Sequence, residues 1–142
     1  MNILVDGGTG FVGHWLHKAQ PKNIKATYLN RADYNMSNWR HEWDAIVHLA
    51  NISPDLVISL KPKRLLYCSS GIVYHPENDI EYRQNKIRWE HECLDSGLDV
   101  VIARLFTFFG DKLDNGKAWA QFNKAAKANQ PPTSRTRILL NV

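Results

Sequence analysis

The sequence has little cysteine, no long hydrophobic run and no strong excess of one charge. Only two of its 142 residues are cysteines, Cys68 and Cys93, and they form no CxxC pair. This usage favours a reduced protein, and we expect a cytoplasmic location. No apolar run reaches the roughly 18 residues of a membrane helix, and residues 1–6 lack a signal-peptide pattern. We therefore expect neither a disulfide scaffold nor a membrane protein.

Charge and composition indicate a globular chain. Lysine and arginine number 18 against 14 acidic residues, which gives a net charge of +4, and 44% of the residues are hydrophobic. This composition supplies a core and excludes a disordered tail, a collagen-like chain or a coiled coil. The mild positive charge suits anionic small molecules as well as nucleic acid. We predict no nucleic-acid partner, because a helix packed on a sheet explains the lysine-rich segment 116–128 with Trp119 and Phe122 on one side.

Short apolar segments alternate with helical patterns along the chain. We predict strands at residues 2–5, 24–29, 45–50, 64–69 and 98–105, with a further strand at 138–140. Helices are predicted at residues 11–19, 39–43, 80–96 and 116–128. The segment 51–62 has room for little more than about one or two helical turns. Strands that alternate with helices predict an α/β fold with a doubly wound parallel sheet, Rossmann-like and forming a single compact domain.

A glycine-rich loop directly follows the first predicted strand. The loop reads GGTGFVG from Gly7 to Gly13 and satisfies both GxGxxG and GxxGxxG. Glycines allow a tight turn and let the backbone approach a pyrophosphate, which amides at the start of the next helix would bind. The strand–loop–helix context favours dinucleotide binding over a turn that only joins strand to helix.

The end of the second predicted strand bears on the choice of cofactor. A carboxylate about twenty residues after the loop would hold the ribose hydroxyls of NAD. This chain has Asn30 and Arg31 there, and a guanidinium suits the 2′-phosphate of NADP. We therefore expect NADP in preference to NAD, with a solvated loop arginine as the other interpretation.

A tyrosine and a lysine four residues apart lie in the predicted helix 80–96. Tyr82 and Lys86 leave the same helix face, and an ammonium group near a phenol lowers the pKa of the phenol toward values useful for proton transfer. Such pairs also occur on exposed helix faces without any catalytic role. Ser70, at the carboxyl end of the fourth predicted strand, favours the catalytic interpretation because ligands of open α/β sheets bind beside those ends.

The order of these motifs resembles the extended short-chain dehydrogenase/reductase family of NAD(P)-dependent sugar epimerases, dehydratases and reductases. The resemblance rests on GGTGFVG at 7–13, HLAN at 48–51, CSSGIVY at 68–74, YRQNK at 82–86 and RLFTFFG at 104–110. It implies an enzyme that acts on a hydroxyl or keto carbon of a nucleotide-linked sugar, with hydride passing to or from nicotinamide. The alternative is a non-catalytic dinucleotide-binding module that serves as a sensor or interaction domain.

The resemblance also implies roles for single residues. Ser70 would hydrogen-bond the reacting oxygen of the substrate, Tyr82 would be the general acid/base, and Lys86 would lower the tyrosine pKa and bind the nicotinamide ribose. Phe106 and Thr107 fall where the family contacts substrate or nicotinamide. The full set of cofactor-binding candidates is Gly7, Gly10, Phe11, Val12, Gly13, Asn30, Arg31, Asp33, Tyr34, Leu49, Ala50 and Lys86.

The chain departs from the family pattern in several places. Asp6 stands where the family usually has threonine, which puts an extra negative charge near the phosphate site. Asn51 replaces a usual small residue. The segment between His48 and Arg64 lacks most of a helix that the family packs at its dimer interface, so a homo-oligomer is left open. We expect residues 1–142 to form the dinucleotide-binding domain, with the smaller C-terminal substrate domain of the family largely absent.

Six histidines raise the question of a metal site. His14 and His17 share a predicted helix face, but no carboxylate or cysteine ligand pair lies at a recognised spacing. We therefore predict no metal ion. The expected partner is a small molecule, a nucleotide sugar.

Overall fold

The computed structural model describes residues 1–30, 42–77, 80–106, 124 and 126–128. The chain divides into two compact units, Met1–Phe106 and Thr107–Val142, and the sheet and its helices belong to the first unit. In the second unit, residues 124, 126 and 127 are helical. The predicted strand 138–140 and most of the predicted helix 116–128 lie outside the described residues.

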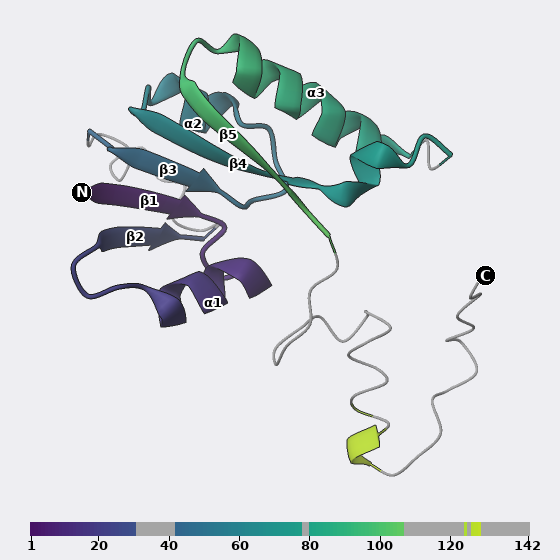
Figure 1. The fold of residues 1–142 in the computed structure, drawn as a ribbon, viewed down its shortest axis with the longest axis horizontal. Coiled ribbons are helices and arrows are strands. Elements are labelled where there is room, and N and C mark those ends of the chain that lie inside the picture. The colour runs from purple at the N-terminus through teal and green to yellow at the C-terminus, as the bar shows by residue number, and fades with distance from the viewer. Residues whose placement is uncertain (31–41, 78–79, 107–123, 125, 129–142) are drawn as a thin grey trace. The chain divides into compact units, whose positions relative to one another are not determined.

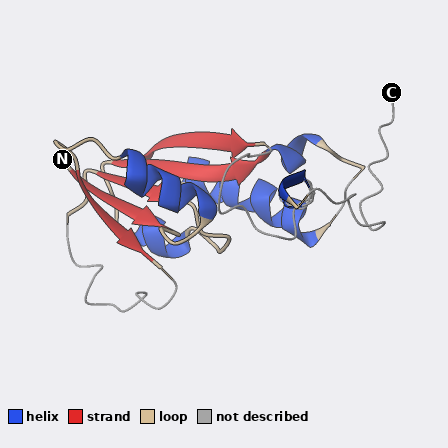
Figure 2. Cartoon of the chain, turned by 90° about the horizontal axis from the view of Figure 1, so that it is seen from below, coloured by secondary structure: helices blue, strands red, loops and turns tan. Residues whose placement is uncertain are grey.

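Five parallel strands form one sheet in the order β2-β1-β3-β4-β5. The strands are β1 (Asn2–Asp6), β2 (Lys25–Leu29), β3 (Ala45–His48), β4 (Arg64–Ser70) and β5 (Asp99–Leu105). Every neighbouring pair is parallel, and the arrows point the same way in Figure 2. The predicted parallel sheet is confirmed, and each of these strands begins and ends within two residues of its predicted bounds.

Helices cover both faces of this sheet. α1 (Phe11–Ala19) lies on one face, and α2 (Asp55–Ser59) and α3 (Glu81–Asp95) lie on the other (Figure 1). A short 3-10 helix, Gly71–Tyr74, follows β4. The α/β, doubly wound, Rossmann-like class is therefore confirmed, and α2 has the short length that its segment allows. Within the described residues no helix is both long and apolar enough to cross a bilayer.

The sequence of α3 explains both its orientation and its end. Its buried residues are Lys86, Trp89, Glu90 and Cys93, spaced three and four apart so that they share one face. This face packs toward β4, and Trp89 and Cys93 join the core. After the helix, Gly97 has a φ of +75°, a left-handed conformation that glycine adopts at low cost. Gly97 thus ends the helix.

The predicted helix 39–43 is wrong at its described end. Glu42 and Trp43 are not helical, and the rest of that segment lies outside the described residues. The Lys63 backbone N donates to the Trp43 carbonyl oxygen at 3.3 Å, so this backbone pairs with the start of the neighbouring strand. The Trp43 side chain is 6% exposed and belongs to the core. Trp43 therefore leads into β3 instead of ending a helix.

Candidate cofactor and catalytic site

The strand order reverses between β1 and β3, and a cavity opens at their carboxyl ends. Ligands of open α/β sheets bind at such a reversal. The cavity has a volume of about 280 Å³ and is lined by Gly7, Thr9, Gly10, Asn30, Leu49, Ala50, Asn51 and Ile52. Five of these are cofactor-binding candidates from the sequence. The sequence reasoning missed Thr9 and Ile52 as lining residues, although Thr9 lies within the GGTGFVG loop and Ile52 directly follows HLAN. It noted Asn51 only as a departure from the family pattern.

The glycine loop is packed too tightly for side chains. Gly7 has a φ of +79°, and a Cβ atom there would lie 2.9 Å from the Ala50 backbone N across the crevice. A Cβ on Gly13 would lie 2.6 Å from the Gly7 carbonyl oxygen and from Gly8 Cα. The Gly10 backbone N donates to the Gly7 carbonyl oxygen at 3.0 Å. Glycine at these positions lets α1 and the end of β3 approach the loop at backbone distance.

The start of α1 suits a negatively charged group. Gly10 is the N-cap residue, no side chain caps the helix, and the first turn contains no acidic residue. Amides in a first helical turn point toward the N-terminus, where the helix dipole favours an anion. Phe11, Val12 and Gly13 form the start of this turn, and Gly10 lines the cavity. The glycine cradle and this helix start together fit the pyrophosphate of a dinucleotide.

Asp6, the unusual residue before the loop, is paired within the protein. Its side chain is fully buried, and Oδ2 lies 2.5 Å from Nδ1 of His48. The two residues are register partners on β1 and β3, so strand pairing places both side chains on the same face of the sheet. The extra carboxylate expected near the phosphate site therefore lies against an imidazole inside the sheet. The spacing of residues in the sequence gives no signal for this pair.

Ser70, Tyr82 and Lys86 come from β4 and α3. Ser70 ends β4, and its Oγ accepts a hydrogen bond from the Ile72 backbone N at 3.3 Å. Lys86 Nζ lies 5.7 Å from the centroid of the Tyr82 ring. The same Nζ donates to the carbonyl oxygen of Cys68, two residues before Ser70, at 3.3 Å. This contact holds the tyrosine–lysine face of α3 against the carboxyl end of β4.

The Lys86 side chain is almost completely buried, with 3% of its surface exposed. Its ammonium group lies 5.2 Å from the centroid of the Tyr67 ring and 5.4 Å from that of Trp89. Burial lowers the pKa of Lys86, while the aromatic faces and the Cys68 carbonyl favour the cation. Tyr82 is 38% exposed, so the cation stands between a buried aromatic cluster and an accessible phenol.

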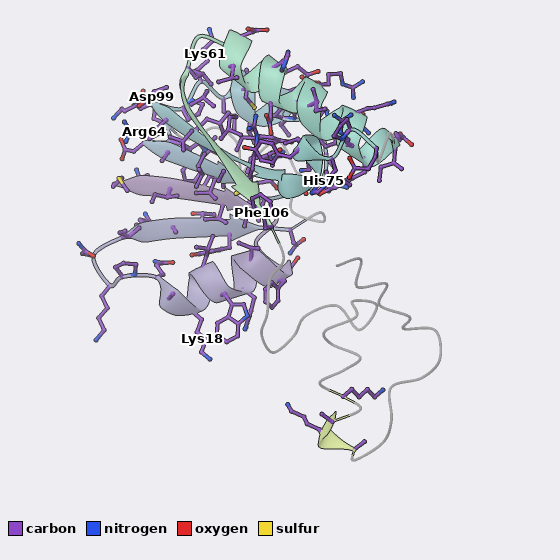
Figure 3. The ribbon with its side chains drawn as sticks, turned by 45° about the vertical axis from the view of Figure 1, so that its right-hand side comes forward. Lys18, Lys61, Arg64, His75, Asp99 and Phe106 are labelled. Atoms are coloured by element: carbon purple, nitrogen blue, oxygen red, sulfur yellow. The ribbon has the colours of Figure 1, made fainter. Side chains whose placement is uncertain are left out.

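A second side-chain network joins α3 to β5. Arg104 donates to both carboxylate oxygens of Glu90, with a shortest distance of 2.7 Å, and to Tyr74 Oη at 2.6 Å. Burial raises the pKa of Glu90, but hydrogen bonds from Arg104 and Ser69 and the nearby charges of Arg104 and His91 together outweigh it and hold that pKa below its usual value. Phe106, at the end of β5 (Figure 3), stacks on Tyr74 with ring centroids 6.2 Å apart and lies against Gly71. Sequence reasoning missed Glu90, Arg104 and Tyr74 because these residues are far apart in the chain.

Some candidate residues fall outside the part of the chain that the structure describes. They are Arg31, Asp33, Tyr34 and Thr107, so the preference for NADP stays a prediction. His14 and His17 contact the rings of Trp15 and Tyr28. Among the described residues, no group of three or more histidine, cysteine, aspartate or glutamate side chains is placed to hold a metal ion.

No model of a known protein family matches the sequence, and no curated protein matches it either. Solved structures do match. The capsular polysaccharide assembling protein CapF from Staphylococcus aureus has a TM-score of 0.80 and 22% identity over 96% of this chain and 43% of its own. The UDP-glucuronic acid 4-epimerase from Bacillus cereus in complex with NAD has a TM-score of 0.70 and 19% identity, and the match covers 93% of this chain and 65% of the epimerase. A GDP-L-fucose synthetase from Naegleria fowleri bound to NADP has a TM-score of 0.61 and 15% identity, and the match covers 96% of this chain and 66% of the synthetase.

At these identities the similarity establishes the fold, which is the α/β Rossmann-like fold of the three proteins. Their structures include an epimerase solved with NAD and a synthetase solved with NADP. The order of motifs in this sequence resembles NAD(P)-dependent sugar epimerases and reductases, which are proteins of the same kind. The chain spans between 43% and 66% of the length of these three proteins.

Proposed function

We propose that the chain binds a nicotinamide dinucleotide, NADP or NAD, and is an oxidoreductase or epimerase acting on a hydroxyl or keto carbon of a nucleotide-linked sugar. The observation that carries this proposal is the cavity at the strand reversal. Its lining brings together cofactor candidates from three separate segments, Gly7 and Gly10 after β1, Asn30 after β2, and Leu49 and Ala50 after β3. A turn that only joined a strand to a helix would not require this convergence.

The residues around the cavity suit the parts of a dinucleotide. The glycine loop and the first-turn amides of α1 would hold the pyrophosphate, with Leu49 and Ala50 along the opposite wall. Arg31 follows Asn30 in the sequence and would meet the 2′-phosphate of NADP. When bound, the nicotinamide supplies hydride transfer to or from the reacting carbon.

Tyr82 is the proposed general acid/base. The Lys86 cation near its ring favours the phenolate electrostatically, and burial of that cation makes its field stronger than it would be in water. When a substrate hydroxyl is oxidised, its proton passes to the Tyr82 oxygen, and in the reduction the tyrosine returns it. Ser70 Oγ accepts from the Ile72 backbone, which leaves the Ser70 hydroxyl proton free to donate to the reacting oxygen.

Fluorescence titration and turnover test the proposal in two stages. NADPH and NADH are first titrated against the emission of the five tryptophans, and turnover of a 4-keto sugar nucleotide is then measured. Tyr82→Phe should lower turnover by about 10³-fold and leave cofactor affinity unchanged, because only proton transfer is lost. Tyr74→Phe is the matched control, since it removes a phenol hydroxyl that contacts Arg104 instead.

The outcomes distinguish the alternatives. Unchanged turnover in Tyr82→Phe contradicts the catalytic role of this tyrosine. Dinucleotide binding without turnover of any sugar nucleotide favours the non-catalytic sensor or interaction module. Failure to bind either dinucleotide contradicts the whole proposal.

A further inference from the structure

A buried ion pair joins the two strands that form the cavity. Asp6 is the last residue of β1 and is 0% exposed, and His48 is the last residue of β3 and is 1% exposed. The residues that directly follow them, Gly7 and Leu49, line the cavity on its two sides. The Leu49 backbone N also donates to the Asp6 carbonyl oxygen at 3.0 Å. The pair therefore lies where both strands pass into the cavity walls.

His48 also contacts the far part of one wall. Its Nε2 lies 3.2 Å from the carbonyl oxygen of Ile52, another lining residue. The Ile52 carbonyl oxygen is an acceptor, so the Nε2 contact is a hydrogen bond only when Nε2 carries a proton. The Asp6 carboxylate lies at ion-pair distance from Nδ1, and it stabilises the ring when Nδ1 carries a proton as well. The Asp6 carboxylate, 2.5 Å from Nδ1 and buried with it, is placed to balance the charge of an imidazolium at His48.

Other titratable groups on this side of the sheet come from β4, α2 and α3. Tyr67 on β4 stacks on the imidazole with ring centroids 5.7 Å apart and an interplanar angle of 20°. The helices that cover this face carry Asp55, Lys86, Glu90 and Cys93. Lys86 lies over the Tyr67 ring, and Glu90 is bonded to Arg104. Asp6 is the group that forms an ion pair with His48.

We propose that Asp6 and the imidazolium of His48 are positioning residues for the cofactor, because they hold residues 49–52 against the glycine loop. This inference rests on the proposed dinucleotide binding and adds a pH dependence to it. When His48 loses a proton, its ion pair with Asp6 is lost and the wall formed by residues 49–52 is released. The tight-binding state therefore holds one proton more than the released state, so affinity falls as pH rises.

The first experiment uses the free full-length chain and needs no cofactor. Imidazole ¹⁵N shifts of His48 and amide hydrogen exchange of residues 49–52 are followed between about pH 5 and pH 9. Both ring nitrogens should be protonated at the acidic end. The protection factors of residues 49–52, which are corrected for the base-catalysed rise of the intrinsic exchange rate with pH, should fall about tenfold as His48 loses its proton. A neutral His48 at the acidic end, or protection factors that do not follow its titration, overturns the inference.

The second experiment measures the Kd of NADPH and of NADH over the same pH range by tryptophan fluorescence. The Kd of the unaltered chain should rise about tenfold with pH. Asp6→Asn removes the charge, and His48→Asn keeps a donor near Nδ1 but loses the Ile52 contact. Both variants should bind about tenfold more weakly at acidic pH and show a flat pH profile. His91→Asn, which changes an exposed histidine on α3, should behave like the unaltered chain.

A pH profile that persists in both variants overturns the inference. If His48→Asn does not fold by circular dichroism, His48→Gln replaces it, since a glutamine amide reaches the Nε2 position and spares the Ile52 contact. Failure of the unaltered chain to bind either dinucleotide contradicts the proposed function and the cofactor role of the pair with it. The exchange experiment then decides separately whether the pair holds residues 49–52.

Discussion

The two halves of the carboxyl edge of the sheet are built in different ways. The β1/β3 crevice takes its shape from missing side chains, because Gly7 and Gly13 let backbone segments meet closely. The region of β4, α3 and β5 takes its shape from long side chains, with Lys86 under aromatic rings and Arg104 bonded to Glu90. Adding atoms should therefore damage the crevice, whereas the second region should be sensitive to removing atoms or charge.

The largest effect is expected from Gly13→Ala in the crevice. The added Cβ would lie 2.6 Å from backbone atoms of Gly7 and Gly8, which cannot rotate away as a side chain would. The free energy of unfolding should fall by about 3 kcal/mol, and NADPH binding should weaken with it. Urea denaturation and fluorescence titration measure the two effects.

Gly97→Ala is the control for that substitution. Gly97 has a φ of +75°, but a Cβ there meets nothing within 4 Å, so only backbone strain of about 1 kcal/mol is expected. Equal losses in the two variants would show that the crevice is not limited by close packing.

The crevice is the half that the sequence predicts better, because the residues that form most of it are neighbours in the sequence. Strand, glycine loop and helix follow one another from residue 2 to residue 19, and local pattern alone places them. The ends of β2 and β3 join the cavity as the parallel topology predicts. A buried tryptophan suits either a helix or the segment before a strand, so local pattern does not decide between them at Trp43. Its burial beside β3 depends on the sheet.

The side-chain networks could not be predicted from the sequence. The pairing of Asp6 with His48 depends on the register between β1 and β3, and no local spacing encodes it. Glu90 and Arg104 meet because α3 crosses back over β5. The four-residue spacing did place Lys86 with Tyr82. Its burial among aromatic rings follows from how α3 packs on the sheet.

Glu90→Gln should give the next largest loss, in the second region. Arg104 donates to both oxygens of this buried carboxylate, and the amide keeps only one acceptor oxygen. The free energy of unfolding should fall by about 2 kcal/mol in chemical denaturation. Asp99→Asn, which breaks an exposed pair with Arg64 at the other end of the same strands (Figure 3), should change it by less than about 0.5 kcal/mol.

The pH dependence of the free energy of unfolding tests separately whether the ionised carboxylate of Glu90 stabilises the fold. Its pKa in the folded chain lies below the ordinary value of 4.5. The stabilisation is therefore present above 4.5 and is lost as pH falls through the lowered pKa. In Glu90→Gln the free energy of unfolding should fall less between pH 4.5 and more acidic pH, because the variant has no carboxylate to protonate at this position. Identical acid profiles for the two proteins would contradict the role of the ionised carboxylate.

Lys86→Met should have a smaller effect, of opposite sign. Burial lowers the pKa of Lys86, so the unfolded chain binds this proton more tightly than the folded chain does. The cost to stability is present at neutral pH and declines as pH rises from the lowered pKa toward 10.5. Methionine should raise the free energy of unfolding at pH 7 by about 1 kcal/mol. It should also remove the rise in that free energy at alkaline pH, and the proposed turnover should fall.

Lys22→Met is the control for the loss of a lysine charge. Lys22 is exposed, so its replacement should change the free energy of unfolding by less than about 0.5 kcal/mol. If Lys86→Met destabilises the chain at pH 7, the cation and its aromatic neighbours contribute more than its burial costs.

Tyr74→Phe should have the smallest effect and shows how far the Arg104 network extends. The change removes a hydroxyl that accepts from Arg104 Nη1 at 2.6 Å and leaves the ring stacked on Phe106. Because Tyr74 is 57% exposed, water can replace the lost partner, and a loss of about 0.5 kcal/mol is expected. The double variant with Glu90→Gln should then lose the sum of the two single effects. A loss well away from that sum would mean that Tyr74, Arg104 and Glu90 act as one unit, because coupled neighbours are not additive.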